Sequence, residues 1–212
     1  MSAARSAPVR SRSETRRRLL GAAASLFDET GTISQRVEEI CARAGFTRGA
    51  FYSNYTGVDQ LYLALHEEQA AAVGVRLQTA LDDELADDCP VGSLDDAVAR
   101  LLAALPAAAE WFSLRAVLLA RAAADASFAD RMMIDDGVVA EGLGERFAAL
   151  AARHGRVPLV EASLLAKAVV AAHIGAVGQA AVDSAPDRTQ LAVVTGVLRG
   201  LTRSATPGQD PA

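Results

Sequence analysis

The sequence predicts an all-α protein, and three observations support this fold class. Apolar residues make up 51% of the 212 residues, with abundant alanine, while aromatic residues make up only 5%. No alternating run of Val, Ile, Thr and Tyr bounded by turn residues is present, which disfavours strands. Apolar residues instead recur at helical spacing between recognisable helix starts and stops. A chain of this length can bury a core as one globular unit or as two closely packed lobes.

The N-terminal segment predicts a basic arm followed by a first helix. Residues 1–12 contain Ser, Ala, Pro and Arg without periodicity, which is typical of a disordered arm. Its arginines, with the run Arg16 to Arg18, either contact DNA phosphates or the minor groove, or only aid solubility. The helix that follows has an apolar face with spacing i, i+4, i+7 and i+8: Leu19, Ala23, Leu26 and Phe27.

A helix-turn-helix is predicted over about residues 36–55. An apolar stripe at i, i+3, i+4 and i+7 marks its first helix. Gly45 can adopt the positive φ that ends a helix sharply, and Thr47 is a side-chain N-cap for a short second helix. Two short helices across a glycine turn form the unit expected of this motif. The stripe consists of Val37, Ile40, Cys41 and Ala44.

The remaining chain predicts further helices, for a total of about nine. A long helix with Leu61, Leu65, Val73, Leu77 and Leu81 inward is followed by an acidic loop over 82–92. Ser93 and Ser127 are the expected N-caps of two later helices, and Ser34 is the expected cap of the first helix of the helix-turn-helix. The expected helices are Asp59 to Leu85, Ser93 to Leu105, Ala108 to Ala124, Ser127 to Gly155, Leu159 to Val182 and Asp187 to Arg203, before a disordered tail over 204–212.

Charge is distributed unevenly along the chain. The net charge is -5, but residues 1–55 contain nine Arg and five acidic residues, a net charge of +4. The remaining residues have a net charge of -9. A basic N-terminal unit on an acidic body is typical of a DNA-reading domain attached to a body that does not bind DNA.

Catalytic and metal-binding motifs are not evident. The sequence contains no Gly-x-Ser-x-Gly, no phosphate-binding glycine loop and no dinucleotide fingerprint, so we expect neither an enzyme nor a cofactor. His66, His154 and His173 lie on three separate predicted helices, and Cys41 and Cys89 form no metal-spaced pair. Two unpaired cysteines predict a reduced cytoplasmic setting, with Cys41 as a small buried hydrophobe.

No targeting or membrane segment is expected. The N-terminus has arginines but no apolar stretch of the kind found in a secretory signal. The most apolar run, Ala168 to Val182, contains His173 and Gln179 and is shorter than the roughly 20 residues of a membrane span. We therefore interpret it as a buried or interface helix.

The first third of the chain resembles the tetracycline-repressor-type (TetR) family of transcriptional regulators. Leu19 to Gly31 is similar to the family's first helix and its closing glycine, and Val37 to Tyr55 is similar to its helix-turn-helix. Asp59-Gln60-Leu61 then resembles the start of the fourth helix. Three positions depart from the family pattern. Val58 replaces a usual lysine that reaches a DNA phosphate, and Gln35 replaces a usual Thr or Ser. Asn54 stands where a His or another ring is common, and it can still donate to a phosphate.

The DNA contacts are expected on the second helix of the motif. Arg48 is the best candidate for a bidentate contact to guanine in the major groove. By resemblance, Tyr52 and Asn54 hold the phosphate backbone, and Arg36 adds a further contact. The predicted DNA-binding residues are Arg36, Thr47, Arg48, Gly49, Ala50, Tyr52, Ser53 and Asn54, whereas Phe51 and Tyr55 belong to the core.

The resemblance implies an effector pocket and a dimer interface in the body. Most large side chains outside the first third gather between residues 111 and 147, where they form either a pocket or plain core. The pocket is predicted from Trp111, Phe112, Arg115, Leu119, Phe128, Met132, Phe147 and His173. A small-residue surface on the last two helices predicts a homodimer interface formed by Ala171, Ala172, Gly175, Ala176, Gln179, Val194 and Leu198.

These observations predict a homodimeric DNA-binding regulator. The domains expected are a DNA-binding domain over 13–73 and an effector-binding and dimerisation domain over 74–203. The partners expected are a palindromic double-stranded operator and a small, largely apolar effector that releases a repressor from DNA, without a membrane. Two alternatives remain. One is an enzyme or ligand carrier whose N-terminal unit serves only for packing. The other is a redox or metal sensor that uses the cysteines and histidines.

Overall fold

The computed structural model describes residues 12–105 and 109–205, and describes only the backbone of residues 109–111, 133–141 and 181. Over these residues the chain forms nine α-helices, one 3-10 turn and a two-stranded sheet, which confirms the all-α fold class. The chain divides into two compact units, one ending at Glu68 and the other beginning at Gln69. The predicted boundary at residue 73 lies further along the same helix. The predicted disordered arm, apart from Arg12, and most of the predicted tail lie outside the described residues.

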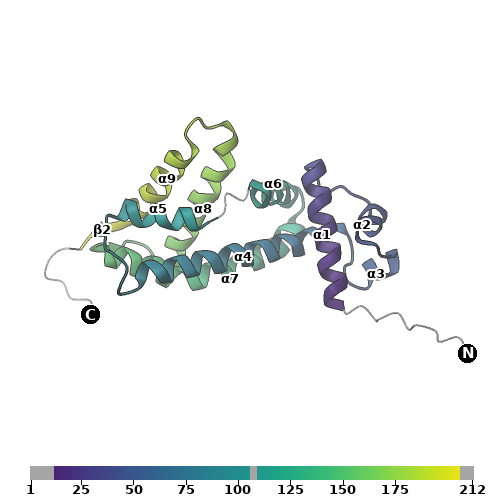
Figure 1. The fold of residues 1–212 in the computed structure, drawn as a ribbon, viewed down its shortest axis with the longest axis horizontal. Helices are drawn as coiled ribbons and strands as arrows, with labels where there is room; N and C mark the ends of the chain where they lie inside the picture. The colour runs from purple at the N-terminus through teal and green to yellow at the C-terminus, as the bar shows by residue number, and fades with distance from the viewer. Residues whose placement is uncertain (1–11, 106–108, 206–212) are drawn as a thin grey trace, which may run out of the picture. The chain divides into compact units, whose positions relative to one another are not determined.

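The first unit contains α1 (Arg12–Thr30), α2 (Val37–Ala44), α3 (Arg48–Tyr52) and the start of α4 (Val58–Leu85). The short helices α2 and α3 lie together on one side of α1 (Figure 1). The predicted apolar faces form the core of this unit, and burying each such side chain contributes roughly 1.5 to 3 kcal/mol. Its fully buried large side chains are Leu19, Ile40, Phe51, Tyr55, Leu61 and Tyr62.

A buried polar network joins the segment before α2 to α4. The Tyr62 hydroxyl donates to Gln35 Oε1 at 2.6 Å, and the Gln35 amide donates to the Thr30 hydroxyl at 2.7 Å. Gln35 therefore takes part in the core and does not cap α2. The cap expected from Ser34 is also wrong, because Arg36 is the N-cap residue, in extended conformation. There the Glu39 carboxylate accepts from the Arg36 backbone N–H at 3.2 Å.

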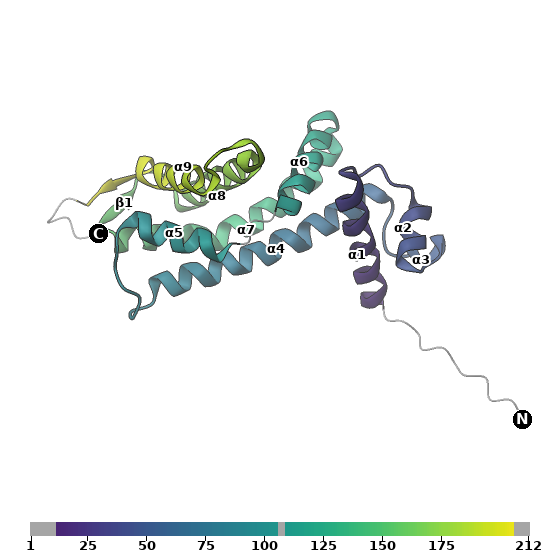
Figure 2. The ribbon, with the colours of Figure 1, turned by 45° about the horizontal axis from the view of Figure 1, so that its top comes forward.

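The second unit contains the rest of α4 and the helices that follow. α8 and α9 lie side by side, and α7 runs alongside α4 (Figure 2). Arg146 of α7 donates to Asp82 of α4 at 2.7 Å. An apolar cluster from α4, α5, α7, α8 and α9 forms much of the core of this unit. The elements are α5 (Leu94–Ala104), α6 (Ala109–Ala124), α7 (Ala126–Arg153), β1 (Arg156–Pro158), α8 (Ala162–Gln179), the 3-10 turn Ala180–Val182, α9 (Pro186–Gly200) and β2 (Thr202–Ser204).

Two predictions about the second unit are wrong in detail. Asp125, rather than Ser127, caps α7, because the Asp125 carboxylate accepts from the backbone N–H of Ser127 and Phe128. The expected helix from Leu159 begins at Ala162, because Arg156–Pro158 pairs antiparallel with Thr202–Ser204. The Arg156 guanidinium stabilises this pairing by donating to the Thr202 hydroxyl and carbonyl at 2.7 and 2.8 Å. Ser93 caps α5 as expected.

By length and composition, α8 is the one described helix that could cross a membrane, with mean hydropathy 1.3 over Ala162–Gln179. This helix is longer than the apolar run in the sequence suggests. A single such helix is weak evidence for a membrane span, because a helix of a soluble protein passes the same test. α8 packs against both α7 and α9.

Candidate nucleic-acid interface and body cavity

The turn between α2 and α3 has the local geometry that the sequence predicts. Gly45 has φ of +71°, and the N–H of the next residue, Phe46, donates to the Cys41 carbonyl at 2.9 Å. A side chain other than glycine is disfavoured at this left-handed position. Thr47 is extended, and its hydroxyl accepts from the Ala50 N–H at 3.3 Å, which caps α3. The chain reverses between the two helices for these local reasons.

Aromatic and arginine side chains fix α3 on the unit. Phe51 and Tyr55 are buried with ring centroids 5.9 Å apart, as predicted for core residues. The Arg16 guanidinium of α1 lies over the Tyr55 ring at 5.0 Å, and the Arg18 guanidinium lies over Phe46 at the same distance. Such cation–π contacts contribute up to about 1 kcal/mol at exposed sites. The arginines at the start of α1 therefore brace the helix-turn-helix.

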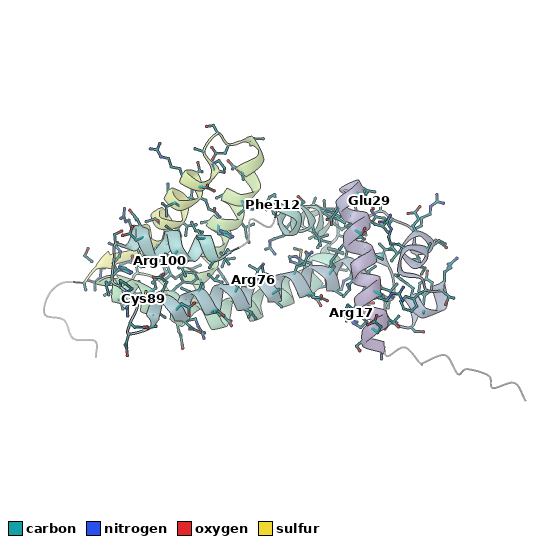
Figure 3. All side chains as sticks on the ribbon, in the orientation of Figure 1. Arg17, Glu29, Arg76, Cys89, Arg100 and Phe112 are labelled. Carbon is teal, nitrogen blue, oxygen red and sulfur yellow. The ribbon has the colours of Figure 1, made fainter. Side chains whose placement is uncertain are left out.

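A further ion pair joins α1 to α2. The Arg43 guanidinium donates to both carboxylate oxygens of Glu29. This hydrogen bond and the positive charge of Arg43 lower the pKa of Glu29. In Figure 3, Glu29 and Arg17 are labelled along α1.

Arg48, the predicted base-reading residue, lies at the start of α3 with its side chain 62% exposed. Its guanidinium contacts Glu38 of α2, with Nη1 at 2.8 Å from the carboxylate, and lies 5.9 Å from the Tyr52 ring centroid. The Tyr52 hydroxyl and then the Glu38 charge raise the pKa of Arg48. The guanidinium of Arg48 is charged, and its contacts with Glu38 and Tyr52 leave it exposed at the start of the helix. It can therefore donate to acceptors on a base edge.

The other predicted DNA-binding residues surround Arg48 on the first unit. Arg36, Thr47 and Gly49 are exposed, and Tyr52 is 51% exposed. The remaining polar side chains bond back to α3: the Ser53 hydroxyl donates to Gly49, and the Asn54 amide donates to Ala50 at 2.8 Å. Asn54 thus stabilises the end of α3. Val58 is the half-buried first residue of α4, so no lysine is present there.

A partly open cavity of about 30 Å³ lies in the body between α4, α5, α7, α8 and α9. Its lining is apolar except for His173, whose Nδ1 lies 2.8 Å from the Gln190 amide nitrogen. Because an amide nitrogen can only donate, Nδ1 accepts and the neutral ring carries its proton on Nε2. Burial lowers the pKa of His173. The lining residues are Leu77, Val98, Leu101, Leu102, Leu105, Phe147, Val169, Val170, His173, Val194 and Leu198.

Of the predicted pocket residues, Phe147 and His173 line this cavity. Phe112, labelled on α6 in Figure 3, packs so closely on Gly178 of α8 that a Cβ there would lie 2.2 Å from its ring. Leu119 is 46% exposed, and the Trp111 side chain lies outside the described residues. The other three residues lie on α6 and α7 without lining the cavity: Arg115, Phe128 and Met132.

Sequence reasoning missed most of the cavity. Three lining residues of α5, Val98, Leu101 and Leu102, recur at helical spacing, and Leu105 follows the end of this helix, so the apolar face was detectable. Nothing local in the sequence indicates that this face meets α8 and α9. The predicted pocket was instead placed where the largest side chains of the body gather, between residues 111 and 147.

The predicted dimer interface requires one correction. Val194 and Leu198 are buried in the chain's own core, where they line the cavity, so they are not free to contact a partner. Ala176 is buried as well, and Ala172 is half-buried. Ala171, Gly175 and Gln179 of α8 are exposed.

The cysteines and histidines do not converge among the described residues. No group of three His, Cys, Asp or Glu residues that could hold a metal ion occurs there. Cys41 is buried, and burial raises the pKa of its thiol. A buried, protonated thiol is a poor nucleophile. Cys89 lies in the loop between α4 and α5, near Arg100 of α5 (Figure 3).

Comparison with known proteins identifies the first unit. Residues 19–65 match the family described as bacterial regulatory proteins, tetR family. No curated protein sequence compared with the chain matches it.

Solved structures match the fold over most of the chain. A putative TetR-family transcriptional regulator from Mesorhizobium loti has TM-score 0.68 and 18% identity, covering 91% of this chain and 98% of that one. A putative transcriptional regulator from Rhodococcus sp. RHA1 has TM-score 0.69 and 18% identity, covering 87% and 94%. A TetR-family regulator from Streptomyces coelicolor has TM-score 0.61 and 19% identity, covering 90% and 91%.

The described chain thus has the fold of solved TetR-family transcriptional regulators, with a side-chain-capped helix-turn-helix in its first unit. The match over residues 19–65 shows the tetR-family domain in this first unit, and the likeness of the rest of the chain to the solved structures is one of fold.

Proposed function

We propose that the chain is a homodimeric repressor that binds a palindromic operator through α3 and releases it when a small, largely apolar molecule binds the body. The observation that carries the DNA-binding part is the Thr47-capped α3, which exposes Arg48 beside Tyr52 and near Arg36. In a two-fold dimer, two such helices read two half-sites about 34 to 36 Å apart. The operator therefore mirrors the symmetry of the protein.

Different side chains of the interface read bases and bind phosphates. Arg48 offers paired N–H donors, which match the O6 and N7 acceptors of guanine in the major groove. Arg36 and Tyr52, exposed on either side, donate to phosphates and position the domain without reading sequence. The two groups should respond differently to substitution.

Selection of binding sites from random DNA tests this division. Arg48→Ala should relax one base position in each half-site and weaken operator binding roughly tenfold to a hundredfold. Tyr52→Phe and Arg36→Ala should weaken operator and random DNA alike, and Arg36→Ala should flatten the salt dependence. An unchanged binding motif with Arg48→Ala would refute the proposed base reader, and the absence of any selected motif would refute operator binding.

The effector is proposed to bind where the apolar cavity lies. At about 30 Å³ the cavity holds little more than one water, whereas pockets for organic ligands are roughly 300 to 1,000 Å³. Binding must therefore separate the lining helices, and Leu77 places α4 among them. Because α4 also belongs to the DNA-binding unit, this expansion provides a means of coupling ligand to DNA.

The cavity surface is apolar, and His173 is the one lining residue that carries a polar side chain. We propose that widening of the cavity exposes the Nε2–H of His173, so an apolar molecule with one hydrogen-bond acceptor, such as a carbonyl, fits better than a pure hydrocarbon or a cation. A thermal-shift screen should find such compounds, and His173→Leu should weaken them while sparing hydrocarbons. Compounds that bind without weakening operator binding would exclude the switch.

A further inference from the structure

The ion pair between Glu38 and Arg48 crosses from α2 to α3 within the DNA-reading surface. Arg48 Nη1 lies 2.8 Å from Glu38 Oε1, and both side chains are more than half exposed. The other side of the guanidinium faces the Tyr52 ring, 5.9 Å from its centroid. Neither side chain of the ion pair fills the core. Both are available on the surface that is proposed to contact DNA.

We propose that Glu38 is a positioning residue that holds Arg48 for its contact with guanine. This inference rests on the proposed role of Arg48 as the base reader. A free arginine side chain loses rotamer entropy when it is fixed on a base. Arg48 is already restricted by Glu38 and Tyr52, so less entropy is lost when DNA binds.

The hydrogen-bond inventory of the guanidinium allows both contacts at once. Arginine has five N–H donors; the contact with Glu38 uses Nη1, and the Tyr52 hydroxyl accepts from one more N–H. Three N–H groups remain, enough for the O6 and N7 acceptors of guanine. Adenine, thymine and cytosine do not offer two acceptors in this arrangement, so a rigid guanidinium discriminates against them.

The charge of Glu38 acts in the same direction. A carboxylate beside the recognition helix repels nearby phosphates and neutralises Arg48, which disfavours a contact between Arg48 and the backbone of unrelated DNA. Glu38 should therefore strengthen operator binding and weaken non-specific binding. Glu38 should thus change the ratio of operator affinity to non-specific affinity more than it changes either affinity alone.

Glu38→Gln, compared with Glu39→Gln, separates this role from a general effect of charge. Both changes remove one negative charge from the first turn of α2. Glu39 accepts from the Arg36 backbone N–H, a bond that glutamine can keep, and has no described contact with Arg48. Glu39→Gln is thus a matched control for stability, helix dipole and net charge.

We expect Glu38→Gln to weaken operator binding about threefold to tenfold and to tighten binding to random DNA by about twofold, with a steeper salt dependence on random DNA. Glu39→Gln should change the ratio less than twofold. In the Arg48→Ala background, Glu38→Gln should cause no further loss of selectivity. Fluorescence anisotropy with operator and scrambled duplexes at several salt concentrations measures all of these.

Three results would overturn the inference. The first is an equal change of the ratio in Glu38→Gln and Glu39→Gln. The second is an unchanged ratio in Glu38→Gln while Arg48→Ala does relax the motif. The third is a new base preference at a neighbouring position, which would mean that Glu38 itself reads a base. If Arg48→Ala leaves the motif unchanged, the base-reader assignment fails instead, and the two failures are distinguishable.

Discussion

Single side chains in this protein combine a local structural role with a role in recognition. Thr47 caps α3 and thereby fixes the residue that follows it, Arg48, at the exposed start of the helix. His173 is the one lining residue of the cavity with a polar side chain, and Gln190 holds it. In each place a polar side-chain contact positions the element or the ring.

Burial of His173 predicts a dependence of stability on pH. Burial lowers its pKa below the ordinary 6.5, so below pH 6.5 the unfolded chain binds a proton that the folded chain does not. The stability contributed by neutral His173 is therefore complete above pH 6.5 and is lost as pH falls toward the folded pKa. His173→Gln should flatten the pH dependence between about pH 6.5 and 5, measured by urea unfolding. The same slope in both proteins would contradict the prediction.

The residues that the sequence predicted best are those with local causes. Gly45, Thr47, Phe51 and Tyr55 were assigned from their own neighbours, and the structure confirms the turn, the cap and the two core rings. The Glu38 contact was missed because it joins two helices across the turn, ten residues apart in sequence.

Two glycines of α7 differ in what an added side chain would meet. A Cβ on Gly144 of α7 would lie 2.8 Å from the backbone carbon of Ala162, at the start of α8. A Cβ on Gly142, on the same helix, would meet only the end of the Gln78 side chain, at 3.1 Å. The backbone cannot move aside as a side chain can.

Gly144→Ala should therefore lower the free energy of unfolding by about 1 to 3 kcal/mol, because it overpacks a backbone contact. Gly142→Ala should be neutral or stabilising by up to about 1 kcal/mol, because alanine favours the helix and Gln78 can move. Chemical denaturation of both variants measures the difference. Equal stabilities would mean that α7 and α8 separate readily at this point.

The positions of the helices along the chain were predictable to within a few residues. Which helices pack against each other was not. The capping residue of α7 was missed because Asp125 and Ser127 are both good N-caps two residues apart. The small sheet was missed because three-residue strands have no measurable periodicity. The cavity was missed because it depends on which faces of five helices meet, and the sequence specifies only the faces.

At the scale of the whole molecule, the proposed function requires two copies of the chain. Gly175 and Gln179 are exposed on α8, the most apolar described helix, while Val194 and Leu198 stabilise the chain's own core. The surface available to a second copy is therefore the outer side of α8 and the exposed residues of α9. Val193 of α9 is exposed, unlike its buried neighbour Val194.

Gly175→Arg tests this assembly without disturbing the chain itself. A Cβ at Gly175 meets nothing within 4 Å, so the new side chain has room in an isolated subunit. In a packed dimer, the charged group would be buried without a partner, which is strongly unfavourable. We expect the variant to remain helical but to become monomeric in light scattering at micromolar concentration. Gly21→Arg on α1, where space is equally open, should remain dimeric.

Loss of the dimer should then appear in DNA binding. One DNA-reading unit alone loses the contacts of its partner, and the second half-site no longer benefits from a high effective concentration, so operator affinity should fall by at least about a hundredfold. Binding to an isolated half-site should change little, because each chain keeps its own α3 and Arg48. A Gly175→Arg protein that stays dimeric, or a wild-type protein that is monomeric, would show that α8 does not form the interface. If the variant is monomeric yet binds the full operator as tightly as the wild type, the two half-sites are read independently and the palindromic operator is wrong.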